Sequence, residues 1–303
     1  MKNILITTEE FMIKDFPEDF VIFKNPYGRK LSEEEAHNLI QRHKPIGMIA
    51  GIEPLTRKTL AKAPFLKVIS RCGIGLDSVA LKAAAELGIK VLNTPDAPTP
   101  AVAELAIALM LAVLRKICLM DGKIRDGEWA RPMGSLLAGK TVGIIGCGRI
   151  GAYVARLAKT FGCNLMGYDP YIKVSPFCTL CDLDVLLRDS DIVTLHIPYT
   201  RENHHIISRE RIFAMKKDAV LINTARGGLI DEEALYDALI KEHLSGAALD
   251  CFEKEPYSGP LVKLENVVLT SHVGSNAKEA RLVMEQQALE NLVKTLAEAN
   301  INA

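Results

Sequence analysis

Short runs of β-forming residues alternate with helical patterns along almost the whole 303-residue chain. Strands separated by helices form parallel sheets, because each helix carries the chain back to the end where the next strand starts. The sequence therefore predicts an α/β protein built from parallel layers. The expected strands lie at residues 3–8, 46–50, 66–70, 90–93, 140–145, 164–168, 191–197, 219–224, 246–251 and 266–271.

A proline-rich segment at residues 93–100 divides this series into two groups of strands. It holds three prolines within six residues, which fix φ and remove backbone donors, so we expect a linker or hinge. A helix from about residue 101 to 115 follows and is apolar on most of its faces, as is usual for a helix buried between domains or subunits. The chain length suits two cores better than one.

A glycine-rich loop follows the strand at 140–145, where Gly146, Gly148 and Gly151 precede a helical pattern. In a dinucleotide-binding loop the first glycine permits a tight turn, the second lets the pyrophosphate approach, and the third lets helix and strand pack closely. Asp169 ends the next strand, 18 residues after Gly151, where an acid binds the adenosine ribose and disfavours a 2′-phosphate. This order predicts NAD, whereas the glycines alone would suit any strand–helix turn.

Three residues suited to the reduction of a 2-keto acid follow strands of the second group. Arg226, Glu255 and His272 come after the strands at 219–224, 246–251 and 266–271. An arginine fork matches a carboxylate, and a histidine beside a carboxylate can exchange a proton near neutral pH. Ligands of open parallel sheets bind beyond the carboxyl ends of the strands, so these side chains can converge. Spacing alone does not establish this, because Arg and Glu are usually surface residues.

Seven segments spread over nearly the whole chain carry a resemblance to a known family. They are Arg-Cys-Gly-Ile-Gly-Leu-Asp at 71–77, Gly-Glu-Trp-Ala-Arg at 127–131, the glycine loop at 146–151, His-Ile-Pro at 196–198, Thr-Ala-Arg-Gly-Gly-Leu-Ile-Asp at 224–231, Leu-Asp-Cys-Phe-Glu-Lys-Glu-Pro at 249–256 and His-Val-Gly at 272–274. Together they resemble the D-isomer-specific 2-hydroxyacid dehydrogenases, and among these the phosphoglycerate dehydrogenase branch.

The resemblance implies an architecture of two doubly wound parallel-sheet domains with a cleft between them. A discontinuous, flavodoxin-like substrate-binding domain would consist of residues 1–96 and 277–303, and a Rossmann NAD-binding domain of residues 97–276. It also implies a homodimer formed through the helix region at 101–120. The printed sequence ends soon after the last predicted helix, so we expect no regulatory domain of the kind that follows it in some relatives.

The resemblance also implies a role for each site residue. Arg226 would bind the substrate carboxylate and carbonyl, His272 would be the general acid in reduction and the base in oxidation, and Glu255 would favour the charged form of His272. Asp250 would hold the nicotinamide carboxamide. The implied cofactor-binding residues are Gly146, Gly148, Arg149, Ile150, Gly151, Asp169, His196, Pro198, Thr224, Ala225, Asp250 and Gly274. The implied substrate-binding residues are Arg71, Gly73, Ile74, Gly75, Arg226 and His272.

One departure from the family bears on the substrate. Relatives that use phosphoglycerate often carry a phosphate-binding arginine just after the strand equivalent to residues 46–50. This chain has Ile-Ala-Gly-Ile-Glu at 49–53 instead, and Arg57 or Arg71 would have to compensate. The substrate is therefore expected to be a phosphoglycerate-like acid or one related to hydroxypyruvate or glyoxylate.

Composition excludes several other classes of partner. Lys plus Arg equals Asp plus Glu, at 37 each, which gives no basic footprint for nucleic acid or a membrane surface. The longest apolar stretch, 101–114, is too short to span a bilayer, and acids near the N-terminus do not suit a signal peptide.

Cys178 and Cys181 form the only CxxC pair, with no second pair at zinc spacing. We expect a cytoplasmic protein without a metal.

The sequence thus predicts an NAD-dependent D-2-hydroxyacid dehydrogenase. One alternative is an NAD-sensing corepressor with little turnover, which would keep the same three residues and differ by a partner-binding motif that the sequence does not display. A formate dehydrogenase is a weaker alternative, since formate has no carbonyl to protonate and such relatives usually place Gln where Glu255 stands.

Overall fold

The computed structural model describes residues 1–298, and the chain divides into two compact units. Unit 1 comprises residues 1–98 together with the chain from Ser275 onward, and unit 2 comprises Thr99–Gly274. The domain boundaries predicted from the resemblance lie at residues 96/97 and 276/277, two residues from each of these divisions. Within residues 1–298, every helix is too short or too polar to cross a membrane.

Unit 1 holds a five-stranded sheet in which every neighbouring pair is parallel. Its strand order is β2-β1-β3-β4-β5, which is the flavodoxin-like order and confirms the predicted fold. The strands are β1 Lys2–Ile6, β2 Phe20–Lys24, β3 Gly47–Ala50, β4 Val68–Arg71 and β5 Lys90–Leu92.

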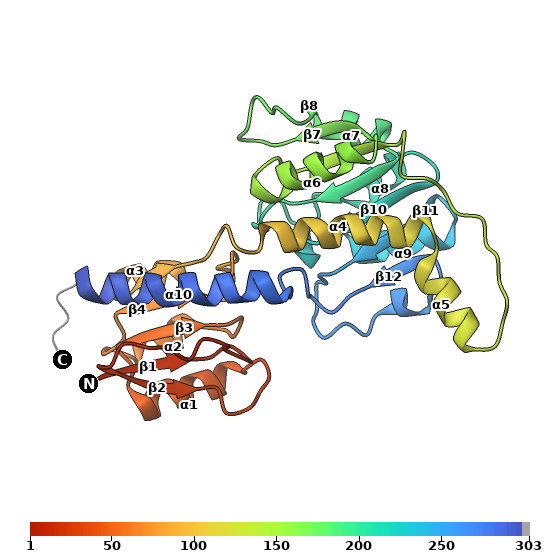
Figure 1. Cartoon of the computed structure of the whole chain (residues 1–303). Helices are drawn as coiled ribbons and strands as arrows, with labels where there is room; N and C mark the ends of the chain where they lie inside the picture. The colour runs from red at the N-terminus through yellow and green to blue at the C-terminus, as the bar shows by residue number, and fades with distance from the viewer. Residues whose placement is uncertain (299–303) are drawn as a thin grey trace. The chain divides into compact units, whose positions relative to one another are not determined.

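Both faces of this sheet are covered, because successive strand residues point to opposite sides. Leu5 and Met48 pack in one core with helices α1 Glu33–His43, α2 Arg57–Ala61 and α3 Leu81–Glu86. Ile4 and Ile49 pack in a second core with α10 Lys278–Glu298. Figure 1 shows α10, in blue, beside the red and orange strands of unit 1 although it comes last in the sequence. The end of the chain therefore completes the first core.

Unit 2 holds a seven-stranded sheet, again parallel throughout. Its order, β12-β11-β10-β9-β6-β7-β8, has the first strand of the unit near the middle, as in a Rossmann fold. The strands are β6 Thr141–Ile145, β7 Asn164–Tyr168, β8 Thr179–Leu180, β9 Ile192–Leu195, β10 Ala219–Asn223, β11 Leu244–Leu249 and β12 Val267–Leu269.

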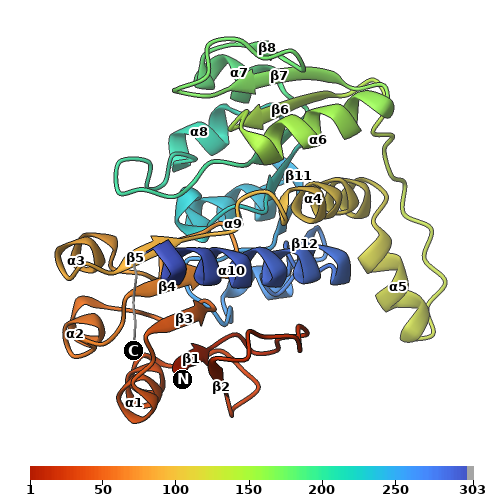
Figure 2. The ribbon, with the colours of Figure 1, turned by 60° about the vertical axis from the view of Figure 1, so that its left-hand side comes forward.

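Helices cover both faces of the second sheet as well. α4 Thr99–Leu114 and α6 Arg149–Thr160 contribute to one core, and they lie side by side in both views (Figures 1 and 2). The opposite core is built with α7 Leu183–Asp189, α8 Arg209–Ala214 and α9 Glu232–Ile240. A further helix, α5 Ile117–Arg125, has no buried residue, and short 3-10 turns lie at η1 Gly227–Leu229 and η2 Pro260–Lys263.

Two local expectations differ from the structure. The predicted linker extends less far than expected, because α4 begins at Thr99 and takes Pro100 into its first turn, where a missing N–H breaks no helical hydrogen bond. Strands β2 and β8 were not predicted, and both are edge strands that bury little or are only two residues long.

Candidate functional site

The glycine loop between β6 and α6 has the shape that its three glycines predict. Gly146 has φ +98°, and a Cβ there would lie 2.7 Å from the His196 carbonyl. A Cβ on Gly151 would lie 1.8 Å from the Gly146 carbonyl oxygen, so only glycine lets the helix approach the strand. Gly148, the N-cap of α6, faces open space. The first helical residues, Arg149 and Ile150, follow it with their backbone N–H groups at the positive end of the helix dipole.

Asp169 lies just beyond β7 and is tied to this loop. Its Oδ2 accepts a hydrogen bond from the Cys147 N–H at 2.9 Å, and its Oδ1 accepts from the N–H groups of Tyr171 and Ile172 at 2.9 and 3.0 Å. The carboxylate therefore fixes both the glycine loop and the start of the segment after β7. Its predicted bond to the adenosine ribose would add to these three contacts.

Two further predicted cofactor residues hold buried polar atoms that lack a partner within residues 1–298. The ring of His196 makes one hydrogen bond, between its Nε2 and Thr194 Oγ1 at 3.0 Å. Its Nδ1 is buried and has no hydrogen-bond partner within residues 1–298. Burial lowers the pKa of His196 to about 3, so the ring is neutral at pH 7. The buried hydroxyl of Thr224 also lacks a partner. These two buried polar atoms fit the binding of a polar dinucleotide, which could pair with them.

The remaining cofactor candidates occupy neighbouring loops of unit 2. Pro198 is exposed after β9, and the Ala225 N–H donates to Asn223 Oδ1 at 2.9 Å after β10. Asp250 is 1% exposed and accepts three hydrogen bonds, from Thr270 Oγ1 at 2.6 Å and from the N–H groups of Val273 and Gly274 at 2.8 Å each. Asp250 thus braces the segment that carries His272, a role that the sequence did not suggest.

The three predicted catalytic residues follow neighbouring strands at one edge of the second sheet. Arg226 comes after β10, Glu255 after β11 and His272 after β12, and these three strands are adjacent and parallel. The Asn223 side chain donates to the Arg226 carbonyl at 2.9 Å, and Arg226 Nη1 donates to the Ala225 carbonyl at 2.7 Å. The fold therefore brings them to one region, as the strand ends predicted.

Glu255 and His272 form a direct pair. His272 Nδ1 lies 3.0 Å from both Glu255 carboxylate oxygens, which leaves Nε2 as the ring nitrogen available to a substrate. The side chains are 38% and 29% exposed, so a small molecule can reach them. His272 has φ +55°, a left-handed conformation that costs a non-glycine residue roughly 1 kcal/mol and is common at functional sites.

Cys251 lies beneath this pair. Its Sγ, a Glu255 oxygen and a His272 ring nitrogen lie within 4.8 Å of one another, the one trio within residues 1–298 that offers three metal-ligand atoms. Burial raises the pKa of the Cys251 thiol far above its usual value, with nearby acids adding to the shift and Arg226 opposing it. At neutral pH Cys251 therefore packs as a neutral thiol.

The substrate residues predicted in unit 1 form a loop after β4. Gly73 has φ +138°, its N–H donates to Thr94 Oγ1 at 2.8 Å, and Asn93 Nδ2 donates to the Ile74 carbonyl at 2.8 Å. A Cβ on Gly73 would lie 1.8 Å from Arg71 Nη1, so the arginine packs against the bare glycine. The backbone of the loop from Gly73 to Gly75 is thus held in place by the side chains of Asn93 and Thr94.

Glu53 stands near this loop, close to where some relatives place a phosphate-binding arginine. It is 1% exposed and accepts a hydrogen bond from Thr7 Oγ1. Burial raises the pKa of Glu53 to about 7, opposed by the bond from Thr7 and by the charge of Arg71. Arg57, one of the two arginines expected to compensate, is 69% exposed and paired with Glu86 at 2.5 Å. Arg71, the other, lies close enough to Glu53 for its charge to act on the carboxyl group. Unit 1 therefore has a buried acid, rather than an arginine, just after β3.

His205, in the loop between β9 and α8, contacts a residue two positions before Glu255. His205 Nε2 bonds to Glu253 Oε1, and the Glu253 N–H donates to Glu232 Oε1 at 2.7 Å. Burial raises the pKa of Glu232, opposed by its bond from Glu253. These contacts hold the loop that carries Glu255. No spacing rule links residues 205, 232 and 253, so their contacts could not be predicted from the sequence.

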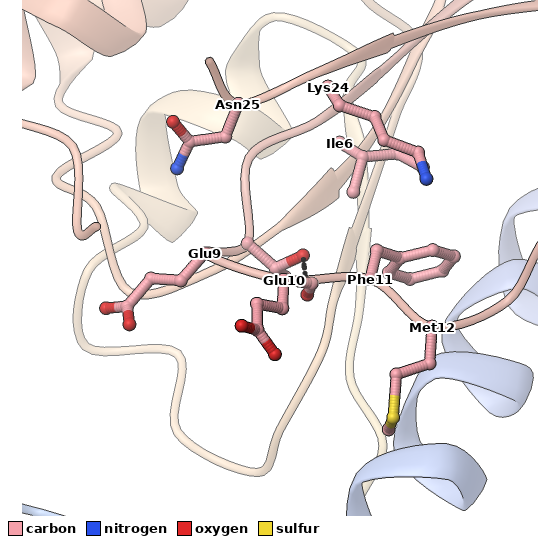
Figure 3. Close-up of a pocket in the computed structure, with 8 residues that line it drawn as sticks. Ile6, Glu9, Glu10, Phe11, Met12, Lys24 and Asn25 are labelled. Atoms are coloured by element: carbon pink, nitrogen blue, oxygen red, sulfur yellow. Dashed lines mark hydrogen bonds between the residues drawn. The ribbon is translucent and has the colours of Figure 1, made fainter. Parts of the chain in front are cut away.

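A hollow in unit 1 lies at the end of β1 and in the segment that follows it. It is lined by Ile6, Thr8, Glu9, Glu10, Phe11, Met12, Lys24 and Asn25. Figure 3 shows the carboxylates of Glu9 and Glu10 apart from the Lys24 ammonium group, and its dashed line marks the bond from Thr8 Oγ1 to the Glu10 carbonyl. Without convergent polar groups, this hollow is a weak candidate for a ligand site.

Comparisons with known proteins agree with this geometry. The family model for the D-isomer specific 2-hydroxyacid dehydrogenase, NAD binding domain, matches residues 107–274. A D-3-phosphoglycerate dehydrogenase of Methanocaldococcus jannaschii is 45% identical over 250 residues, which cover 80% of this chain and 48% of that protein. A hydroxypyruvate reductase of Thermotoga maritima is 44% identical over 238 residues, 76% of this chain and 78% of that protein.

A solved structure, the TT0316 protein of Thermus thermophilus, superposes with a TM-score of 0.87 at 36% identity and covers 98% of this chain and 97% of that one. The chain spans about half the length of the phosphoglycerate dehydrogenase above but most of the hydroxypyruvate reductase. The similarity therefore extends over both units of the fold.

Proposed function

The chain belongs to the D-isomer-specific 2-hydroxyacid dehydrogenase family, and we propose on this premise that it is an NAD-dependent oxidoreductase acting on a small 2-hydroxy acid. The observation that carries the proposal is the pair formed by His272 and Glu255. These residues and the glycine loop all follow strands of the same sheet. NAD, when bound, supplies or accepts the hydride. The relatives named as reductases and dehydrogenases favour this over an NAD-sensing corepressor.

The residues of this chain would divide the remaining work. Arg226 would hold the carboxylate of the substrate, because its planar fork matches two carboxylate oxygens. In the direction of reduction, His272 would donate the proton on Nε2 to the carbonyl oxygen while the carbonyl carbon gains the hydride. Glu255, bonded to Nδ1, would orient the ring and stabilise its charged form. In oxidation the same proton returns to His272.

The cofactor would occupy the glycine loop. The N–H groups at the start of α6 would bind its pyrophosphate, Asp169 its adenosine ribose, and Asp250 its carboxamide, with His196, Pro198, Thr224, Ala225 and Gly274 lining the site. We prefer NAD to NADP because a 2′-phosphate would meet the negative charge of Asp169. NADH should therefore bind more tightly than NADPH in a fluorescence titration, and Asp169→Ser should narrow the difference.

The substrate is proposed to be an unphosphorylated acid of the hydroxypyruvate or glyoxylate kind. The supporting observations are the buried Glu53 and the pairing of Arg57 with Glu86 in unit 1. Arg71 and the backbone of Gly73, Ile74 and Gly75 are proposed to contribute to substrate binding, with unit 1 as the substrate-binding domain and unit 2 as the NAD-binding domain. The similarity to phosphoglycerate dehydrogenases keeps 3-phosphoglycerate as the second candidate.

A screen of 2-keto acids with NADH tests this proposal. Hydroxypyruvate, glyoxylate and phosphohydroxypyruvate would be compared by the decrease in NADH absorbance. We expect turnover with hydroxypyruvate or glyoxylate and a lower kcat/KM with the phosphorylated acid. Turnover of the phosphorylated acid alone would reverse the preference, and no turnover of any 2-keto acid would contradict the assignment as an enzyme.

A homodimer is proposed on the apolar surface that follows α4. Ile117, Ile124, Trp129, Met133 and Leu136 are between 49% and 88% exposed in a single chain, which is unusual for large apolar side chains so close in sequence. Sedimentation of the parent protein should give the mass of a dimer, and the double variant Trp129→Glu with Leu136→Glu should give the mass of a monomer.

A cytoplasmic location is proposed because all seven cysteines are free thiols, as in a reducing compartment.

A further inference from the structure

Two cysteines of unit 2 that lie far apart in the sequence come together beside the glycine loop. Cys147 is the residue between Gly146 and Gly148, and Cys178 precedes β8, yet their Sγ atoms are 3.8 Å apart. The room for both sulfurs comes from Gly167 in β7, where a Cβ would lie 2.4 Å from Cys178 Sγ and 2.7 Å from Cys147 Sγ. Cys181 stands at CxxC spacing from Cys178 in the sequence, but the thiol at 3.8 Å from Cys178 Sγ is that of Cys147.

The two thiols are not equivalent. Cys147 is buried, whereas Cys178 is partly exposed at the end of a segment whose other residues, Tyr171, Val174 and Phe177, are 89%, 82% and 41% exposed. The hydrogen bond from Cys147 lowers the pKa of Cys178, and the Ser175 hydroxyl, 3.4 Å away, adds to the shift. The same bond raises the pKa of Cys147, with burial as the next cause. Cys178 is therefore the thiolate that a small oxidant can reach.

We propose that Cys147 and Cys178 form a reversible disulfide when the protein meets a small-molecule disulfide such as oxidised glutathione. The Cys178 thiolate attacks one sulfur of the oxidant, forms a mixed disulfide and releases one thiolate. Cys147 then loses its proton to solvent and attacks Cys178 Sγ, which expels the second thiolate. Two protein thiols are oxidised and one disulfide is reduced to two thiols, so the exchange balances.

This bond would act on the nucleotide loop. The Cys147 N–H holds Asp169 Oδ2, and Asp169 Oδ1 holds the first N–H groups of the segment that ends at Cys178. A disulfide has an S–S distance of about 2.05 Å, so the two sulfurs must approach and pull this segment toward the glycine loop. The oxidised protein should bind NADH about tenfold or more weakly, because ångström-scale displacements of a positioned site cost that much. This consequence rests on NAD binding, whereas the disulfide itself does not.

Peptide mapping of the full chain tests the proposal directly. Cys118 is exposed and would form background mixed disulfides, so every variant would carry Cys118→Ser. Trypsin places Cys147 in residues 141–149 and both Cys178 and Cys181 in residues 174–188. After incubation with oxidised glutathione, we expect a cross-link between these two peptides that a dithiol removes. The cross-link should persist in Cys181→Ser and disappear in Cys178→Ser and Cys147→Ser.

Two outcomes would overturn the proposal. One is the absence of the cross-linked peptide, and the other is a cross-link that survives in Cys178→Ser but is lost in Cys181→Ser. The consequence for the cofactor would be measured separately, by NADH fluorescence titration of the reduced and oxidised protein, with the oxidised Cys178→Ser variant as the matched control. Equal NADH affinity in the two states of the parent protein would contradict the proposed effect on the nucleotide loop.

Discussion

The two units use the same parallel-sheet architecture but place different chemistry at their strand ends. In unit 2, the charged side chains of Arg226, Glu255 and His272 follow β10, β11 and β12. In unit 1, the strand ends carry a buried acid, Glu53, and a glycine loop held by Asn93 and Thr94. We propose from this difference that the proton-exchanging and carboxylate-binding side chains come from unit 2, whereas unit 1 contributes mainly backbone groups held in a fixed shape, together with Arg71.

The largest fall in kcat/KM should follow from a change of one charged side chain at the strand ends of unit 2. Arg226→Lys keeps the positive charge but loses the planar fork, and we expect kcat/KM to fall about a thousandfold. NADH affinity should stay unchanged, because the proposed role of Arg226 concerns the substrate alone. Steady-state kinetics with the best 2-keto acid and an NADH titration measure both. A fall of less than tenfold would show that the carboxylate is held elsewhere.

A matched pair of glycine changes separates packing from cofactor binding within unit 2. Gly151→Ala places a Cβ 1.8 Å from the Gly146 carbonyl oxygen, and overpacking of this kind costs about 1–3 kcal/mol or more of stability. Gly148→Ala meets open space and should leave the melting temperature unchanged, yet it should weaken NADH binding where the phosphates approach. Equal melting temperatures in both variants would contradict the close contact of α6 with β6.

The buried acid of unit 1 predicts a pH dependence of stability. The pKa of Glu53 is raised from 4.5 to about 7, so folding penalises its ionised form. The contribution of Glu53 to the free energy of unfolding should be most favourable below pH 4.5. It should fall as the pH rises through about 7, by about 3 kcal/mol at most. Glu53→Gln should remove that fall, so that the variant gains on the parent between pH 5 and 8 in urea unfolding. A parallel pH profile in both proteins would show that Glu53 ionises freely.

The smallest effect should come from a side chain of the unit 1 loop. Ile74→Ala leaves the backbone groups in place and removes only a few side-chain contacts. We therefore expect kcat/KM to change by less than about threefold. Gly73→Ala in the same loop should be far worse, since φ is +138° and a Cβ would lie 1.8 Å from Arg71 Nη1. Similar kinetics in these two variants would contradict the view that unit 1 acts through its backbone.

The same contrast explains how much of the molecule could be predicted. The parallel sheets and the glycine loop were predictable because strand–helix alternation and glycine spacing are local patterns in the sequence. The rule that ligands bind at carboxyl strand ends made a convergence of Arg226, Glu255 and His272 possible, and only the resemblance to the family singled these residues out. The contacts of His205 with Glu253 and of Cys147 with Cys178 were not predictable, because they join residues 48 and 31 positions apart without a repeating pattern.

We propose that His272, held by Glu255, exchanges the proton during hydride transfer at the strand ends of unit 2. The most direct test is His272→Ala, measured by NADH oxidation with the best 2-keto acid and by NADH fluorescence titration. We expect a loss of turnover of about a thousandfold or more with unchanged NADH affinity. Full activity in His272→Ala would contradict it.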